Sequence, residues 1–194
     1  HIIDLPGTYS LNASSIDESV VIELLLNKNS KDFPDVCIVV TDVENLKRNL
    51  LLFTQVKDLG IPTVLVINME DQMKRKGISL NIALLEEALD TKIALVSTRQ
   101  DKGLEVLKDA ILNFRQLSIA QSISLNSIDK EYFKNLEKIF PNQSIYKLWL
   151  IITQDINFVK IDRKRISDAT DFKILEPQYL KRLQQKETVK RFQF

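Results

Sequence analysis

Residues 63–71 read Thr63-Val64-Leu65-Val66-Ile67-Asn68-Met69-Glu70-Asp71, an apolar and β-branched run that ends in polar residues. Such a run predicts a strand, Thr63–Asn68, that is covered on both faces of a sheet. Similar short runs predict three further strands, at His1–Asp4, Val36–Thr41 and Lys92–Ser97. Between the runs, apolar residues recur at helical spacing. The alternation predicts an α/β fold with a parallel sheet and helices on both faces.

The helices expected within this part are Ser15–Asn27, Asn45–Leu59, Ile78–Leu89 and Gly103–Phe114. Beyond a polar stretch at residues 118–127 the strands stop. The later helices expected are Asp129–Phe140, Ser144–Gln154, Asp162–Thr170 and Pro177–Phe192. We therefore predict an α/β domain over residues 1–115 and a small all-helical subdomain over residues 116–194.

Composition and charge exclude few classes of function. The 194 residues carry 27 Lys and Arg against 26 Asp and Glu, a net charge of +1, so no nucleic-acid partner is expected. Residues 160–194 are richer in basic than in acidic side chains, which a solvated helix face explains better than a membrane or nucleic acid. No apolar stretch approaches the roughly 20 residues that cross a bilayer.

Asn68-Met69-Glu70-Asp71 gives an N-x-x-D pattern at the end of a strand. The Asp71 carboxylate can accept two hydrogen bonds from the ring N–H and the amino group of guanine, whereas adenine lacks that donor pair. Asn68 would brace the loop, and Met69 would lie against the base as an apolar plate. Taken alone, the pattern fits an ordinary Asx-rich turn equally well.

Two further patterns follow strand ends. Backbone N–H groups of Ser97-Thr98-Arg99 can point at the guanine O6, although a helix start also explains Ser and Thr here. In Asp4-Leu5-Pro6-Gly7, Asp4 can hold Mg²⁺ through water and Gly7 lets the backbone approach a phosphate, although a plain turn explains this pattern alone.

The three patterns together are more specific than any one of them. All fall at the carboxyl ends of strands, where ligands of open α/β sheets bind. Their order and spacing match a small GTPase, which predicts a Ras-like P-loop GTPase fold that binds GTP or GDP with Mg²⁺. The nucleotide-binding residues predicted are Asp4, Leu5, Pro6, Gly7, Asn68, Met69, Glu70, Asp71, Ser97, Thr98 and Arg99.

The phosphate-binding loop is missing from this pattern. A P-loop has the form G-x-x-x-x-G-K-[S/T], and none of the four glycines of the chain precedes a Lys. We therefore expect residues 1–194 to be a fragment that lacks the P-loop and first switch, keeps guanine recognition, and is inactive as an enzyme. No catalytic residue is assigned.

The sequence around the motifs resembles the ferrous iron transport protein B family over about Ile2–Leu112. The resemblance rests on Asp4–Leu11 with Asp17-Glu18, Asn45–Leu50 with Gln55, Gly60-Ile61-Pro62, Asn68–Asp71, and Val96–Arg99 with Gly103-Leu104. Met69 stands where most GTPases have Lys. The helical remainder is similar to the family's nucleotide-release-controlling subdomain, with Lys181–Gln185 leading towards membrane spans.

The resemblance implies a cytoplasmic G domain of an integral membrane protein, on the cytoplasmic side of the bacterial inner membrane. The partner it implies is a membrane-spanning Fe²⁺ transport domain of the same polypeptide, with the nucleotide state regulating Fe²⁺ uptake. The family's potassium-binding residues would lie upstream of His1. A homo-oligomer is a further partner that the sequence leaves open.

Two alternatives also stay open. One is a soluble GTPase of the ribosome-assembly or tRNA-modification type, in which the basic C-terminal helices contact RNA. The other is an interaction domain on a degenerate G scaffold that binds no nucleotide.

Overall fold

A computed structural model describes residues 1–12, 15–154 and 175–193. The chain forms two compact units. The sheet unit comprises Pro34–Ser122, and the helical unit comprises His1–Phe33 together with Ile123–Gln193. The predicted domain division at residue 115 stays a prediction. Within the described ranges, none of the helices is long and apolar enough to cross a membrane.

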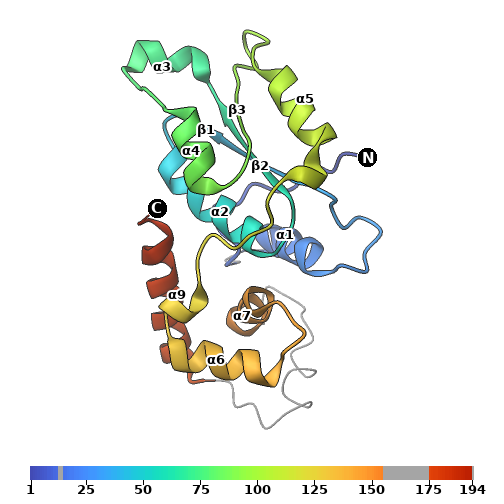
Figure 1. Cartoon of the computed structure of the whole chain (residues 1–194), viewed down its shortest axis with the longest axis vertical. Coiled ribbons are helices and arrows are strands. Elements are labelled where there is room, and N and C mark those ends of the chain that lie inside the picture. The colour runs from blue at the N-terminus through green and yellow to red at the C-terminus, as the bar shows by residue number, and fades with distance from the viewer. Residues whose placement is uncertain (13–14, 155–174, 194) are drawn as a thin grey trace. The chain divides into compact units, whose positions relative to one another are not determined.

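The sheet unit is built on three parallel strands in the order β1-β2-β3 (Figure 1). The strands are β1 Cys37–Asp42, β2 Thr63–Asn68 and β3 Ile93–Leu95. The helices are α2 Leu46–Asp58, α3 Glu70–Lys76, α4 Ile82–Leu89 and α5 Leu104–Leu112, followed by the 3₁₀ turn η1 Phe114–Gln116. The predicted parallel α/β fold is confirmed.

The central strand carries the core of this unit. Val64, Leu65 and Ile67 of β2 have no exposed surface, as expected for a strand covered on both faces. Because parallel crossovers are right-handed, two successive crossovers in one direction place α2 and α4 on one face. Helix α5 covers the other face, where Leu104 and Leu107 pack on the β2–β3 core (Figure 1).

The helical unit contains α1 Ile16–Leu26, the 3₁₀ turn η2 Leu125–Ser127, α6 Lys130–Ile139, α7 Ile145–Thr153 and α9 Pro177–Arg191. Side chains of Ser15, Asp129 and Ser144 cap α1, α6 and α7 by accepting a backbone N–H. In its core the rings of Phe133 and Trp149 meet edge to face, 5.2 Å apart.

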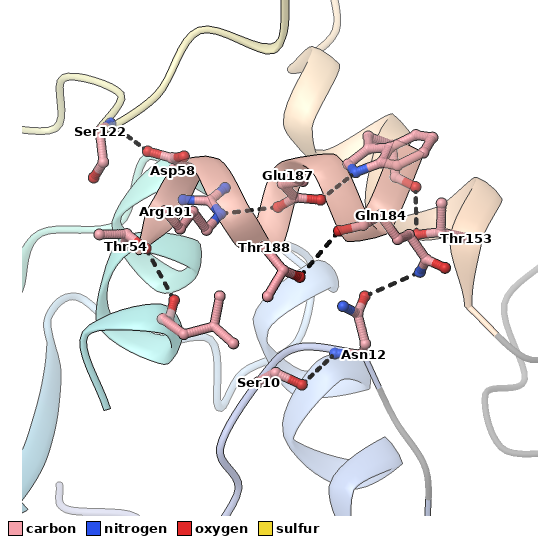
Figure 2. Close-up of polar contacts among 12 residues, drawn as sticks. Ser10, Asn12, Thr54, Asp58, Ser122, Thr153, Gln184, Glu187, Thr188 and Arg191 are labelled. Atoms are coloured by element: carbon pink, nitrogen blue, oxygen red, sulfur yellow. Dashed lines mark hydrogen bonds and ion pairs between the residues drawn. The ribbon is translucent and has the colours of Figure 1, made fainter. Parts of the chain in front are cut away.

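A buried polar network joins α9 to α7 within this unit. Glu187 of α9 accepts a hydrogen bond from the Trp149 indole N–H at 2.6 Å and pairs with the Arg191 guanidinium at 2.9 Å (Figure 2). The Arg191 guanidinium also lies over the Tyr146 ring, 4.8 Å from its centre. Glu187 and Arg191 are both almost completely buried, so the fold keeps a charged pair in its interior.

One expected strand is absent, and one helix was not expected. Residues 1–12 contain no strand, and Ile2 is 95% exposed, because an apolar dipeptide makes a strand only where a neighbouring strand completes its hydrogen bonds. Helix α3 was not predicted, because Glu70–Lys76 is polar and only seven residues long. The helix expected at Asp162–Thr170 lies outside the described residues.

Candidate functional site

The carboxyl ends of β2 and β3 lie side by side, because the two strands are parallel neighbours in register. The backbone N–H of Val96 donates to the carbonyl of Ile67 at 2.8 Å, and that of Glu70 donates to the carbonyl of Val96 at 3.0 Å. These bonds tie the loop after β2 to the loop after β3. The sequence motifs on the two loops therefore form one site.

The Asn68 side chain links the two loops by hydrogen bonds. Its Oδ1 accepts hydrogen bonds from the backbone N–H of Met69 at 2.8 Å and of Thr98 at 3.3 Å. Its amide nitrogen lies 3.4 Å from the Thr98 hydroxyl. The side chain of Asn68 is thus occupied in shaping the site.

Asp71 lies in the first turn of α3, where the helix dipole favours a negative charge. The buried Ser97 hydroxyl donates to its Oδ1 at 2.8 Å, and the Gln72 amide donates to its Oδ2 at 3.2 Å. The bond from Ser97 is the main cause that holds the pKa of Asp71 below its usual value, and the Arg99 charge lowers it further. Asp71 is therefore an ionised acceptor at neutral pH.

Met69 occupies a strained backbone conformation between these two residues. It has φ 65° and ψ 34°, in the left-handed region that an unbranched side chain adopts at a cost of roughly 1–2 kcal/mol. Its side chain is 43% exposed. This turn starts α3 directly after the strand and leaves an apolar side chain uncovered beside Asp71.

Gly103 helps to close the loop after β3, a role that the sequence motifs did not indicate. Ser97 and Lys102 exchange both backbone hydrogen bonds at 3.1 Å, so the loop between them is tight. Gly103 follows with φ 78°, and a Cβ added there would lie 2.1 Å from the carbonyl oxygen of Leu95. Gly103 thus holds the loop against β3. Gln72, which donates a hydrogen bond to Asp71, is a second residue of the site that the motifs did not indicate. For Gly103, the signal available in the sequence was a glycine that follows a polar loop.

The four residues Asp4-Leu5-Pro6-Gly7 belong to the helical unit and have no regular structure. Asp4 and Gly7 are exposed, and a Cβ on Gly7 would meet nothing within 4 Å. Among the described residues no group of three or more His, Cys, Asp or Glu could hold a metal ion. A single carboxylate does not by itself make a Mg²⁺ site, so the role of Asp4 stays a prediction.

A parallel α/β sheet whose strand ends present an Asn-x-x-Asp loop and a Ser-Thr loop defines a G domain. The family model described as Ferrous iron transport protein B matches residues 1–111. Because that match covers more than half of the chain, the protein belongs to the ferrous iron transport protein B family, and the predicted family is confirmed.

Individual relatives agree with this assignment. The chain is 36% identical over 107 residues to the Fe(2+) transporter FeoB of Leptospira biflexa, covering 55% of this chain and 15% of the relative. It is 39% identical over 119 residues to that of Escherichia coli K12, covering 59% and 15%. The chain therefore spans about 15% of the length of these relatives.

Solved structures give the same fold. The FeoB G-domain from Methanococcus jannaschii is 36% identical, with a TM-score of 0.53 over 58% of this chain and 69% of that one. The GMPPNP form of the cytosolic domain of the T. maritima FeoB iron transporter has a TM-score of 0.76 over 98% of this chain and 77% of that one, at 22% identity. The second match covers the helical part as well, at the level of fold.

Proposed function

We propose that this chain recognises the guanine base within the cytosolic G domain of a ferrous iron transporter whose nucleotide state regulates Fe²⁺ uptake. The observation that carries the proposal is the Asp71 carboxylate, which Ser97 and Gln72 hold by one hydrogen bond on each oxygen. Each carboxylate oxygen accepts about two hydrogen bonds. One acceptor site on each oxygen therefore remains for the paired N–H donors of guanine.

The geometry favours guanine over adenine for a physical reason. Adenine would desolvate the Asp71 carboxylate without supplying the two donors. This costs a few kcal/mol, which corresponds to discrimination against adenine on the order of a hundredfold or more. Backbone N–H groups of Thr98 and Arg99 would face the guanine O6, and Met69 would cover one face of the ring. GTP and GDP share the base, so this site binds both.

Phosphate binding has less support in this chain. The sequence contains no G-x-x-x-x-G-K-[S/T] loop, and Asp4–Gly7 offers one carboxylate and one glycine. We therefore infer that residues 1–194 alone bind guanine nucleotides weakly and do not hydrolyse GTP. Mg²⁺ held by Asp4 through water, and K⁺ held by residues outside the chain, would add to binding in a longer protein.

The family supports the remaining parts of the proposal. Its named relatives are Fe(2+) transporters, so we place this chain on the cytoplasmic side of the bacterial inner membrane, joined to a transport domain of the same polypeptide. The family match favours this function over a soluble GTPase that assembles ribosomes or modifies tRNA.

Titration of residues 1–194 with GMP and with XMP, followed by amide NMR, tests the base site. GMP should shift the signals of residues 68–72 and 97–103 more strongly than XMP does. In Asp71→Asn the preference should reverse towards xanthine, whose ring carries an acceptor where guanine has the amino donor. Asp101→Asn is the matched control and should keep the preference for guanine, since Asp101 lies in the same loop region with a left-handed φ of 53° that Asn tolerates. An unchanged base preference in Asp71→Asn would remove the proposed role.

A further inference from the structure

Helix α9 separates its charged residues onto two sides. Its buried side consists of Leu180, Leu183, Glu187 and Arg191, and there the Glu187 carboxylate pairs with the guanidinium. Its outer side, here termed the basic face, carries the exposed side chains of Lys181, Arg182, Lys186 and Lys190. Glu187, the one carboxylate within α9, is therefore buried and does not offset the charge of the basic face.

The charges of the basic face have no ion-pair partner in the part of the chain that the structure describes. Within residues 1–12, 15–154 and 175–193, none of its four cations lies within 4 Å of a carboxylate. Asp129, whose carboxylate feels the Lys186 charge, is already engaged by the Tyr179 hydroxyl at 2.6 Å and by the first turn of α6. The positive potential of this face is thus directed at the solvent.

Helix α6 of the same unit differs from α9 in the charges that it exposes. It also carries three exposed lysines at four-residue spacing, Lys130, Lys134 and Lys138. Exposed Glu131 and Glu137 lie among them, so its surface carries both signs of charge. Of these two helices, α9 alone combines a row of exposed basic side chains with the absence of exposed acidic residues inside the helix.

The basic face also has an apolar component. Val189 is 57% exposed and stands between two shallow hollows of about 570 and 420 Å³. The larger hollow is lined by Arg182, Lys186 and Lys190 together with Ile128. The smaller one is lined by Lys181, Gln184 and Thr188. Cations surround a modest apolar surface, and neither hollow is deep.

We propose that the basic face of α9 docks on an anionic lipid bilayer. Arg182, Lys186 and Lys190 are four residues apart, so the row extends over about 12 Å and meets several headgroups rather than one ligand. The exposed Val189 suits the glycerol region beneath the phosphates, whereas an acidic peptide would need a deeper apolar pocket for tight binding. The cytosolic domain of a membrane transporter has such a surface within reach. The proposal rests on the family membership and does not depend on the guanine site.

Co-sedimentation of residues 1–194 with vesicles tests the proposal. We expect binding to vesicles that contain phosphatidylglycerol, no binding to pure phosphatidylcholine, and a loss of binding in high salt. Each basic residue near an anionic surface contributes about fivefold, so Arg182→Gln, Lys186→Gln and Lys190→Gln together should weaken partitioning on the order of a hundredfold.

The matched control is Lys130→Gln with Lys134→Gln and Lys138→Gln, which removes the same charge at the same spacing from α6. This variant should stay within about threefold of the parent. Circular dichroism should show both variants folded, since all six side chains are exposed. Equal losses in the two variants, no binding of the parent to anionic vesicles, or tighter binding of soluble polyglutamate than of vesicles would overturn the proposal. Asp71→Asn should leave vesicle binding unchanged, which separates this test from that of the guanine site.

Discussion

Replacing Glu187 by Ala tests whether the buried network holds α9 in place. The change takes the carboxylate away from a guanidinium and an indole N–H that are both buried, at 2.9 and 2.6 Å (Figure 2). Breaking a buried ion pair from one side costs about 3–5 kcal/mol, and a lost buried hydrogen bond about 1–3 kcal/mol. Because the two terms share one side chain, we expect a total of about 4 kcal/mol, a large part of the 5–15 kcal/mol that stabilises a domain.

Urea denaturation followed by the fluorescence of Trp149, the single tryptophan, measures this loss where it occurs. With a urea dependence of about 2 kcal/mol per molar, the midpoint should fall by about 2 M. Glu187→Gln keeps the shape and one acceptor and should lose less. Glu137→Ala removes an exposed carboxylate of the same unit and should stay close to the parent. A loss below about 1 kcal/mol in Glu187→Ala, or one equal to that of Glu137→Ala, would refute the reasoning.

The remaining predictions concern the two loops of the proposed base site. Gly103→Ala should destabilise the sheet unit by more than the roughly 1–2 kcal/mol of a left-handed alanine, because its Cβ would lie 2.1 Å from the Leu95 carbonyl oxygen; Gly77→Ala, with φ 64° and open space, is the control in thermal unfolding. Ser97→Ala removes the main cause of the lowered pKa of Asp71, so that pKa should rise towards 3.8 in an NMR titration. Guanine binding needs the ionised carboxylate and is lost as the pH falls through this pKa, so the loss should begin at higher pH in Ser97→Ala; an unchanged pKa would argue against the Ser97 bond.

The sheet could be predicted from the sequence because its strands are strongly patterned. The predicted range Thr63–Asn68 coincides with β2, and the helix predicted over Asp129–Phe140 differs from α6 by one residue at each end. In both segments local propensity and burial favour the same structure. Capping side chains such as Asp129 mark the helix ends from within the sequence.

Other features could not be predicted, because they depend on contacts distant in the sequence. The Ser97 hydroxyl donates a hydrogen bond to Asp71, which is 26 residues away in the sequence. The motifs indicated both residues but not the bond between them. Glu187 and Arg191 look like an exposed pair on a solvated helix, yet Trp149, 38 residues away, draws the carboxylate into the interior. Charge patterns along one helix do not reveal which side the rest of the fold covers.

The positive backbone angles bear on the proposed recognition of the guanine base. Met69, Asp101 and Gly103 all have left-handed φ, and all three lie in or beside the loops that hold Asp71. Each such turn is maintained by hydrogen bonds of the protein itself, from Asn68 in one loop and between Ser97 and Lys102 in the other. The acceptor geometry is thus preorganised without a ligand, and binding of the base need not supply the free energy to form it. Phosphate binding requires different groups, so the proposed recognition of the base does not depend on how the phosphates are held.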